Sequence, residues 1–400
     1  MVKQASLVSE LAEIIGGRGT ANGTKADAVD GVIPEAVASP GTYEEACRLL
    51  AHANERRVAV IPLGGRQHAG LGNMPARYAI ALDTRRLSGV VEFEPADLTI
   101  TVRAGTILGE LRAATAASGL TVPFDPSIPD DATVGGVLAA NVSGPARVSL
   151  GQPRDFTIGM RVVAADGRLT RAGGKVVKNV AGYDLCKLYI GSLGTLAVIV
   201  EATFKTVPLP QKQLALAFGF ADPGAACRHV SDAVRAGLKV RSALLTREAS
   251  YIELAGTPEA VARSEFDIAA AASKLGAAQI AAAPPKPLDA PVIARIEALP
   301  SRLPALLSEA ATAFPDADIA AQPWDGVCRI GVSEAGAIEA VRAIAVRHGG
   351  PCVVECCPAE AKRALDVFGP RPPAFELMRA VKRELDPNGV LSPGRFVGRL

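Results

Sequence analysis

Three glycine-rich stretches hold the residue types in this sequence that could bind a large ligand. They read GGRQH at 64–68, TVGGVLAANVSG at 133–144 and GSLGT at 191–195. Glycine lacks a Cβ and tolerates positive φ, so backbone N–H groups in such stretches can approach a bound group closely. Successive N–H groups in a turn converge on an anion without a lysine, and the small residues of 133–144 leave room for a planar group. We therefore expect a phosphate-bearing ligand lined by backbone; the alternative is three tight connections that bind nothing.

Metal and iron–sulfur chemistry has little support in the sequence. The four histidines, His52, His68, His229 and His348, are far apart, and no HxH or HxxxH spacing occurs. The seven cysteines form no CxxC pair, which argues against zinc knuckles, iron–sulfur cradles and a disulfide scaffold. We predict no metal site, buried thiols, and surface positions for His52, His229 and His348.

Composition limits the partners and the location. Lysine and arginine number 43 against 41 acidic residues, and no block of like charge stands out, so nucleic acid is not expected as a partner. No apolar run approaches the roughly 18 residues that span a bilayer, and the first residues, MVKQASLVSELAEII, lack the apolar core of a secretion signal. We expect no transmembrane segment and a cytoplasmic protein that reaches the inner membrane only through partners.

Helices and strands alternate around the glycine-rich stretches. A capping box at Thr42, with Glu45 three residues later, predicts a helix that ends near Arg57. A strand at 58–61 then leads directly into residues 64–68. Residues 173–205 read as a turn, a short helix, the third glycine-rich stretch and a buried strand.

The segments between the first and third stretches also carry local signals. Thr106 is predicted to cap a helix, and Asp166-Gly167 between two apolar runs predicts a hairpin with a type I′ turn. Residues 123–151 read as a loop that is too long and too polar for a simple connection in a compact domain, which indicates a functional role. Further strands are predicted at 78–82, 90–93 and 98–104, the last from the alternation of Leu98, Ile100, Val102 and Ala104.

Pro208-Leu209-Pro210 is predicted to end this first part of the chain. Beyond it, strands alternate with helices in a pattern that suggests an antiparallel sheet backed by helices. A helix at 374–385 followed by turns closes the pattern. Strands are expected at 214–220, 243–246, 251–255, 327–332 and 352–356, and helices at 258–275 and 334–347.

The segment VVKNVAGYDLCKLYIGSLGTLAVIVEATFK, residues 176–205, resembles the block that closes the FAD-binding domain of the vanillyl-alcohol oxidase, or PCMH-type, flavoprotein family. Its sequence is most similar to those of the FAD-binding subunits of glycolate oxidases. The similarity covers residues 33–208, and a weaker similarity occurs at the C-terminus. It implies an α+β fold, with a PCMH-type FAD-binding domain of two α+β subdomains at 32–208 and an antiparallel-sheet α+β cap domain at 209–365. Residues 1–31 would form an N-terminal helix and loop, and residues 366–400 a C-terminal helix and tail that return to the FAD domain.

The resemblance also implies which residues contact FAD. Some relatives attach FAD covalently through a histidine directly after the Gly-Gly pair, but Arg66 occupies that position here. We therefore expect non-covalent FAD, with His68 shaping the loop or bonding a phosphate. Arg395 is expected to be structural, with a site role as the alternative. The implied cofactor-binding residues are Gly64, Gly65, Arg66, Gln67, His68, Thr133, Gly135, Gly136, Ala140, Asn141, Ser143, Gly144, Leu193, Gly194, Thr195 and Ile199.

Departures from the family pattern bear on the activity. Family enzymes often read Gly-Ser-Glu-Gly-Thr-Leu-Gly, whereas this chain has Leu193 and Ala197 at the glutamate and the last glycine. The glycolate oxidase FAD-binding subunit shares the leucine. The His-rich metal motif of family members that oxidise hydroxy acids alone is missing, and neither a catalytic base nor a carboxylate clamp can be recognised.

The resemblance therefore implies an FAD-dependent oxidoreductase. It would be the FAD-binding subunit of a glycolate oxidase that oxidises a small 2-hydroxy acid, glycolate, to glyoxylate, together with a second FAD subunit and an iron–sulfur subunit. Two alternatives stay open: a stand-alone FAD oxidoreductase of another hydroxy acid or alcohol, and a scaffold subunit that has lost its flavin. We expect the chain alone to oxidise glycolate or lactate slowly or not at all, and the cap to carry the partner contact.

Overall fold

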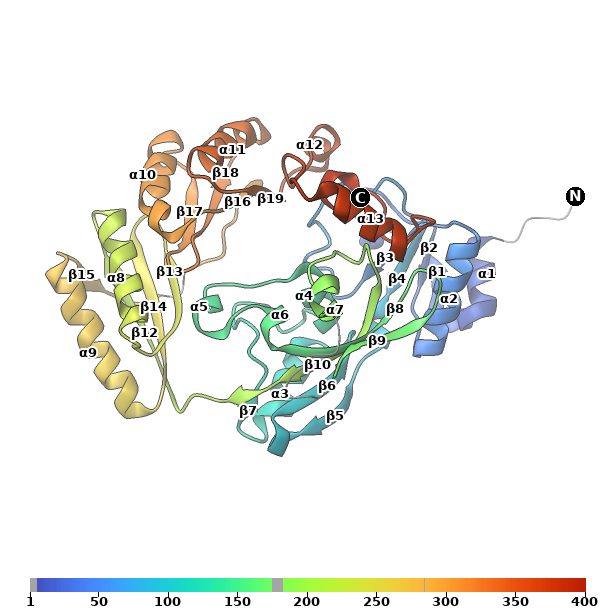
Figure 1. Ribbon diagram of the computed structural model, residues 1–400, viewed down its shortest axis with the longest axis horizontal. Helices are drawn as coiled ribbons and strands as arrows, with labels where there is room; N and C mark the ends of the chain where they lie inside the picture. Colours follow the sequence, from blue (N-terminus) through green and yellow to red (C-terminus); the bar gives the residue numbers. More distant parts are fainter. Residues whose placement is uncertain (1–5, 175–182, 284) are drawn as a thin grey trace, which may run out of the picture.

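The protein forms two lobes that face each other (Figure 1). The structure, a computed structural model, describes residues 6–174, 183–283 and 285–400. The first lobe contains the chain up to β11 (Val207–Pro208) and the C-terminal helix α13 (Phe375–Leu385). The second, called the cap lobe below, contains all strands from β12 (Lys212–Gly219) onward.

A four-stranded sheet opens the first lobe, in the order β1 (Thr20–Asn22), β2 (Ala36–Ala38), β4 (Ile80–Asp83) and β3 (Val60–Leu63). Strands β2 and β3 run parallel to β4, and helices α1 (Leu7–Ile15) and α2 (Tyr43–Glu55) pack beside the sheet. The predicted cap of α2 is present, since Thr42 Oγ1 accepts from Glu45 N at 3.2 Å. The Glu45 carboxylate reaches one residue further back than expected, to Gly41 N at 2.6 Å.

A five-stranded antiparallel sheet forms the other half of the first lobe. Its order is β5 (Val90–Glu94), β6 (Thr99–Arg103), β10 (Val198–Lys205), β8 (Thr157–Val163) and β9 (Leu169–Gly173). The predicted β8–β9 hairpin is confirmed, but its turn is not of type I′: Gly167 has a φ of +84°, whereas Asp166 does not have the positive φ that this turn type also requires. The short helix and buried strand predicted within 173–205 are α7 (Leu185–Tyr189) and β10. The part of that segment at 175–182 lies outside the described residues.

Two local predictions in this lobe are wrong. Thr106 does not cap α3 (Leu108–Ala116), because its Oγ1 accepts instead from Gly89 N at 2.9 Å and the N-cap position falls on Ile107. Leu98 does not join the buried alternation of its strand: it adopts a φ of +54° in the turn before β6 and stays 41% exposed.

The segment predicted as a long loop, 123–151, is partly helical. It contains α4 (Val134–Ala140) and α5 (Arg147–Leu150), and α6 (Pro153–Phe156) follows. Thr133 caps α4 through its side chain, and Asn141 ends the helix in the left-handed region with a φ of +50°. Strands β7 (Leu120–Thr121) and β11 pair in a separate two-stranded sheet.

The cap lobe is built on one eight-stranded antiparallel sheet that consists of two similar halves. Each half has the chain order strand, helix, strand, strand, helix, strand, which is the ferredoxin-like arrangement. The halves join where Leu245 of β13 pairs with Ala321 of β17. The first half contains β12, α8 (Pro223–Arg235), β13 (Val240–Leu245), β14 (Ala249–Gly256), α9 (Pro258–Lys274) and β15 (Ala278–Ile280). The second contains β16 (Val292–Glu297), α10 (Leu303–Ala313), β17 (Asp318–Gln322), β18 (Val327–Val332), α11 (Ile338–Arg347) and β19 (Cys352–Cys356).

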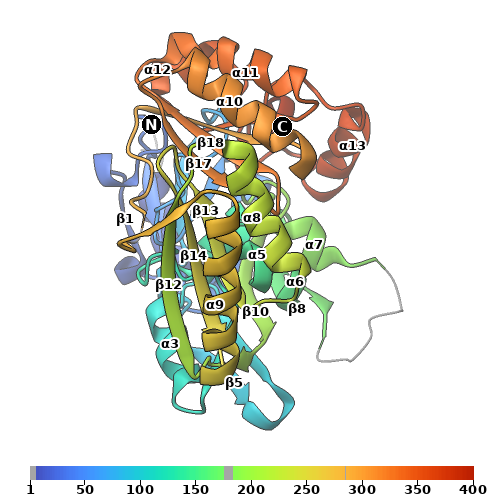
Figure 2. The ribbon, with the colours of Figure 1, turned by 90° about the vertical axis from the view of Figure 1, so that its left-hand side faces the viewer.

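Helices α8, α9, α10 and α11 lie on one face of this sheet, and Figure 2 shows them in front of the strands. The opposite face is turned toward the first lobe (Figure 1). The prediction that His229 of α8 lies on the surface is wrong, because this residue is only 1% exposed. Its Nε2 lies 3.0 Å from the carbonyl oxygen of Ile268. Its ring packs against Phe218 and Phe220, because it lies on the buried side of the helix.

After the cap lobe, α12 (Ala359–Ala364) and α13 bring the chain back to the first sheet. Val60 N donates to Val390 O and Ser392 N donates to Val60 O, both at 2.8 Å, so the tail adds a short parallel bridge beside β3. None of the helices in the described ranges combines the length and the apolar character needed to cross a bilayer.

Candidate functional site

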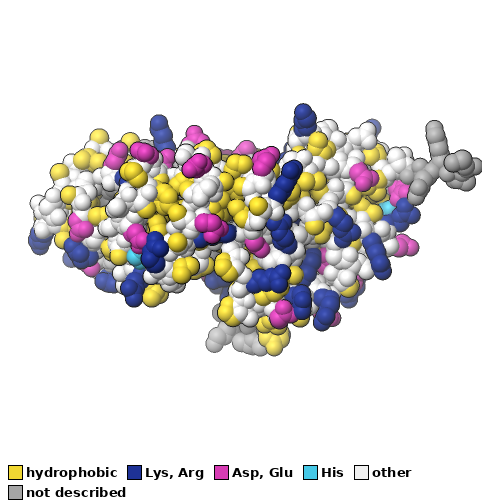
Figure 3. Space-filling model, turned by 90° about the horizontal axis from the view of Figure 1, so that it is seen from above, with side chains coloured by type: hydrophobic (Ala, Val, Ile, Leu, Met, Phe, Trp, Pro, Cys, Tyr) yellow, Lys and Arg dark blue, Asp and Glu magenta, His cyan; other side chains and the backbone are white. Residues whose placement is uncertain are grey.

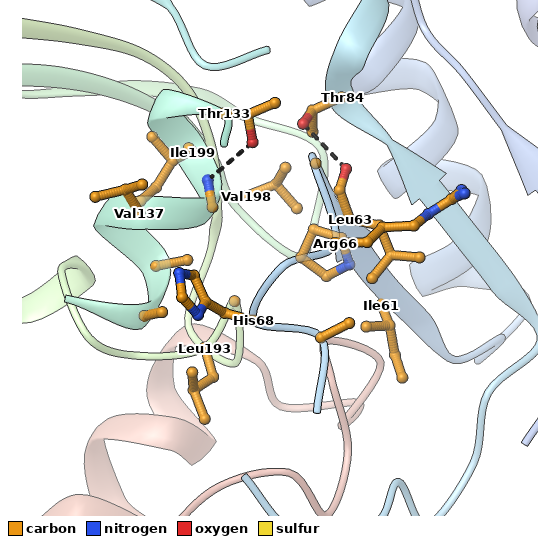
Figure 4. A pocket seen from close by; sticks show the side chains of 18 of the residues that line it. Ile61, Leu63, Arg66, His68, Thr84, Thr133, Val137, Leu193, Val198 and Ile199 are labelled. Carbon is orange, nitrogen blue, oxygen red and sulfur yellow. Dashed lines mark hydrogen bonds between the residues drawn. The ribbon is translucent and has the colours of Figure 1, made fainter. Parts of the chain in front are cut away.

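The three glycine-rich stretches meet at one cleft in the first lobe (Figure 4). The cleft encloses about 790 Å³, counting the space open to solvent. Eleven of the residues implied by the family resemblance line it: Gly64, Arg66, Gln67, His68, Thr133, Gly135, Gly136, Ala140, Leu193, Gly194 and Ile199. The others, Gly65, Asn141, Ser143, Gly144 and Thr195, are not among its lining residues.

Thr133 connects the first two stretches. Its Oγ1 accepts from Gly65 N at 3.1 Å and, as the cap of α4, from Gly136 N at 3.4 Å. On the other side of the loop, Thr84 Oγ1 donates to Leu63 O at 3.1 Å (Figure 4). Two non-glycine residues, Arg66 and Leu193, adopt positive φ values of 69° and 53°. Such conformations are costly and tend to occur where backbone geometry serves a site.

The glycines of the cleft have different structural roles. A Cβ at Gly64 would lie 2.0 Å from Thr133 Oγ1, one at Gly135 would lie 2.9 Å from Ala104 Cβ, and one at Gly194 would lie 2.5 Å from Pro62 Cγ. Glycine is therefore required at these positions by the close packing of the protein itself. A Cβ at Gly136 would meet only Thr133 Oγ1, at 3.1 Å, and would otherwise enter open space. Position 136 thus keeps the cleft free for a ligand.

Unpartnered polar atoms around the cleft test whether an anionic cofactor would fit. Arg66 Nη2 is paired with Asp27 at 2.8 Å, but Arg66 Nε is buried without a hydrogen-bond partner in the described part of the chain. The same holds for His68 Nε2, and burial lowers the pKa of this imidazole, so it is neutral at pH 7. An available guanidinium donor, a neutral histidine and a backbone-lined wall suit a phosphate-bearing cofactor.

Buried cations from the tail hold the loops of the cleft in place. Arg395 lines the cleft, yet its guanidinium pairs with Asp30 and donates to the carbonyl oxygens of Ala69, Leu71 and Asn73, so its role is structural. Lys382 Nζ donates to Thr195 O at 2.7 Å, beside the third glycine-rich stretch. Burial lowers the pKa of both cations, while Asp30 and Asp386 respectively counteract the shift.

A charged cluster on the helix-free face of the cap lobe was not found by the sequence analysis. It consists of Arg295 in β16, Arg329 in β18 and Glu355 in β19. None of the three residues lines the cleft, but the face that carries them is turned toward the first lobe, and the charge of Glu355 partly opposes the lowering of the His68 pKa. The sequence contains one sign of this cluster, because each of the three charged residues interrupts a short apolar strand. No glycine pattern or motif marks it, however.

The remaining predictions concern metals and thiols. Within the described ranges, no group of three or more His, Cys, Asp or Glu side chains is arranged to hold a metal ion. Cys186, Cys227, Cys328 and Cys352 are buried, as predicted, but Cys356 is exposed. Burial raises the pKa of the Cys328 thiol to about 12, which makes that side chain unreactive.

Comparisons with known proteins identify the ligand class. Residues 34–173 match the family described as FAD binding domain, and residues 335–396 match the family described as FAD linked oxidases, C-terminal domain. The first match contains the glycine-rich stretches 64–68 and 133–144. FAD is therefore the cofactor that the first lobe binds.

Curated relatives align over part of their length. Glycolate oxidase subunit GlcD of Bacillus subtilis is 36% identical over 204 residues, which are 51% of this chain and 43% of that protein. Glycolate oxidase subunit GlcE of Escherichia coli is 42% identical over 136 residues, or 34% of this chain and 39% of that one. D-2-hydroxyglutarate dehydrogenase of Xanthomonas citri pv. viticola is 36% identical over 184 residues, or 46% and 39%. The aligned segments thus span less than half of each relative.

Solved structures share the whole fold. An alkyldihydroxyacetonephosphate synthase superimposes with a TM-score of 0.74 at 19% identity, over 98% of this chain and 85% of the other. A p-cresol methylhydroxylase does so with a TM-score of 0.72 at 17% identity, over 97% and 95%. At such identities the likeness concerns the fold alone, and it confirms the predicted α+β architecture of the PCMH type with an antiparallel cap.

Proposed function

We propose that this chain, which combines an FAD binding domain with the C-terminal segment of the FAD linked oxidases, is an FAD-dependent oxidoreductase that oxidises a small 2-hydroxy acid. In this proposal it is the FAD-binding subunit of a glycolate oxidase. It works in the cytoplasm with a second FAD subunit and an iron–sulfur subunit, and it converts glycolate to glyoxylate. Its domains are those expected above, with FAD in the first lobe, the substrate beneath the cap lobe and the tail closing over the FAD domain.

The observation that carries the proposal is the cleft at which residues 64–68, 133–144 and 193–199 converge. The chemistry that bound FAD would supply is two-electron oxidation of the substrate, as the acceptor of a hydride. The protein's part is to hold the cofactor through backbone donors and Arg66, and to keep water out with the apolar side chains of Ile61, Val137 and Ile199.

The substrate class rests on the relatives. Glycolate and D-2-hydroxyglutarate, which appear in the names of the three relatives described above, are both 2-hydroxy acids. The likeness to GlcD and GlcE supports a multi-subunit enzyme, and the leucine at position 193 follows the glycolate oxidase pattern. We place the contact with the partner subunits on the cap lobe.

Purified protein tests the proposal directly. The chain alone should show flavin absorbance but should turn glycolate over with an artificial electron acceptor more slowly than about 1 per second, the lower end of ordinary enzyme rates. Co-expression with the two partner subunits should raise the rate at least tenfold. Absence of flavin absorbance after addition of FAD would reduce the chain to a scaffold.

A second candidate is a stand-alone dehydrogenase of another hydroxy acid. The likeness to D-2-hydroxyglutarate dehydrogenase and the charged cluster near His68 favour it. Turnover of a 2-hydroxy acid by the isolated chain at about 1 per second or faster would select this candidate over the subunit.

A further inference from the structure

Two arginines lie directly opposite each other on neighbouring strands of the cap lobe. In the antiparallel pair of β16 and β18, Arg295 is in register with Arg329. Side chains alternate between the faces of a strand. The neighbours Ala294, Ile296, Cys328 and Ile330 all pack in the core under the helices. Both arginines therefore project from the helix-free face, toward the first lobe.

Like charges in this position destabilise a sheet unless a counter-charge separates them. Glu355 of β19 fills that role, with its Oε1 2.7 Å from Arg295 Nε and its Oε2 2.8 Å from Arg329 Nε. Burial alone would raise the pKa of Glu355, but the two guanidinium groups outweigh it and hold the pKa below its usual value. Glu355 is therefore ionised at pH 7, and one carboxylate is shared by two cations.

This sharing leaves hydrogen-bond donors free. Arg329 binds Glu355 side-on through Nε and Nη2, and Arg295 binds it through Nε. Among the described residues, no hydrogen bond uses Nη1 of Arg329 or Nη2 of Arg295. A guanidinium is a planar fork whose donors point in fixed directions. Because Glu355 occupies the Nε edges, these two donors remain for another acceptor.

The surroundings of the cluster place it between the lobes. The charge of Glu355 acts on His68 in the cleft, and the charge of Arg147 in α5 acts on Arg295. Arg147 itself is paired with Asp325 at 3.3 Å. Each side chain of the cluster is about a quarter exposed, at 24% for Arg295, 25% for Arg329 and 23% for Glu355, so a small solute can reach it.

In the partly buried part of the cluster, two guanidinium groups share one carboxylate. Arg295 and Arg329 face the single carboxylate of Glu355, and Arg147 is balanced by Asp325. Glu297 also contacts Arg295, but its side chain is 45% exposed and screened by water. Two partly buried guanidinium groups, each with a free and oriented donor, are suited to a carboxylate, whose two oxygens can accept one charge-assisted hydrogen bond from each arginine.

We propose that Arg295 and Arg329 form the anchor for the carboxylate of the substrate, oriented by Glu355 and facing the cleft from the cap lobe. This inference rests on the proposed function and makes it more specific, because it assigns the acid group of the 2-hydroxy acid to named residues. It also accounts for an arrangement that a purely structural ion pair does not need, namely a second arginine opposite the first.

Oxalate and oxamide are the probes that test the anchor. Oxalate is a small carboxylate with no C–H bond to oxidise, and oxamide has the same skeleton without charge. Binding of each is measured by calorimetry on protein with and without added FAD, because the anchor consists of protein side chains alone. The variants are Arg295→Met, Arg329→Met and Glu355→Gln. The control is Arg347→Met, which removes an arginine from the outer helix layer, where it pairs with Glu309.

Loss of either arginine of the anchor should weaken oxalate binding about tenfold or more, the effect of losing a charged hydrogen bond. Oxamide binding and FAD content should not change, and Arg347→Met should behave as wild type. Glu355→Gln should leave oxalate binding unchanged or tighter, because it removes a competing negative charge.

The proposal is overturned if wild-type protein does not bind oxalate, if both arginine variants bind it as wild type does, or if Glu355→Gln weakens it as much as Arg329→Met. Should Arg329→Met not fold, Arg329→Lys decides, since lysine keeps the charge but not the fork and should also weaken oxalate binding. If the protein binds oxalate but not FAD, the proposed function is refuted and the anchor stands. If it binds FAD but not oxalate, the anchor is refuted and the proposed function stands.

Discussion

Nη1 of Arg395 lies 3.1 Å from Oδ2 of Asp30, and these two residues are 365 positions apart in the chain. The other carboxylate oxygen of Asp30 lies 2.7 Å from Lys362 Nζ. All three side chains are almost completely buried, with exposures of 7% or less. One aspartate thus joins the N-terminal segment, helix α12 and the tail, next to the loop that follows residues 64–68.

Asp30→Asn should strongly destabilise the protein. The substitution removes the shared negative charge and leaves two buried cations, and breaking a buried pair in this way costs about 3–5 kcal/mol. Urea denaturation followed by circular dichroism measures the change in the free energy of unfolding. Asp232→Asn is the matched control, because Asp232 pairs with Arg235 on the surface at 3.5 Å and such pairs contribute about 1 kcal/mol or less. Equal effects of the two substitutions would refute the structural role of Asp30.

Gly136→Ala should weaken FAD binding without harming the fold. Its new Cβ would enter the cleft, where overpacking of about 1–3 kcal/mol corresponds to a loss of about 10- to 100-fold in FAD affinity. Within α4 the alanine should instead favour the helix by about 1 kcal/mol. Fluorescence titration with FAD and thermal unfolding of the apoprotein measure the two effects.

Gly135→Ala and Gly70→Ala are the controls for that substitution. The Cβ at 135 would press on Ala104 at 2.9 Å, so this variant should lose stability, whereas the Cβ at 70 would meet nothing within 4 Å. A Gly136→Ala protein with wild-type FAD affinity would mean that FAD does not contact this wall of the cleft.

FAD should leave the protein on denaturation. Arg66 stands where some relatives have their flavin-linked histidine, and the polar atoms of His68 and Arg66 can hold a phosphate by hydrogen bonds alone. Heating followed by filtration should therefore place the flavin colour in the filtrate. Colour retained on the denatured chain would show a covalent bond and contradict this prediction.

Acid should destabilise the cap lobe through His229. Burial lowers the pKa of this imidazole, and the hydrogen bond to Ile268 O only partly opposes the shift. The folded state therefore stays neutral at a pH at which the unfolded chain already takes up a proton, so stability is present above about pH 6.5 and is lost as the pH falls below it.

His229→Gln keeps a donor for Ile268 O but cannot titrate. Between about pH 7.5 and about pH 5.5, the wild-type free energy of unfolding should fall more than that of the variant. Urea denaturation at the two pH values gives both differences. Identical losses in the two proteins would mean that His229 is protonated in the folded state.

Local sequence determined the elements around the FAD cleft. The glycine pattern at 191–195, the strand after it and the Asp166-Gly167 turn could be read from neighbouring residues, because backbone φ and short-range alternation are set within a few positions. For the same reason, most residues expected from the first lobe's family resemblance line one cleft. The predictions for Thr106 and Leu98 were wrong because other interactions outweighed the local preference. The hydroxyl of Thr106 accepts a hydrogen bond from Gly89 N instead of capping α3, and Leu98 adopts a positive φ in a turn instead of extending β6.

Only the tertiary structure decided which charges act together. Arg329 and Glu355 are 26 positions apart and Arg295 and Glu355 are 60 apart, so nothing in the spacing of these residues indicates that they meet. Strand order and register bring them to one face of the cap sheet, and the packing of the two lobes places that face near His68. His229 entered the core for a similar reason, since the side of a helix that becomes buried depends on the sheet against which it packs. Side-chain clusters assembled from several strands follow from long-range pairing, which a local reading of the sequence does not contain.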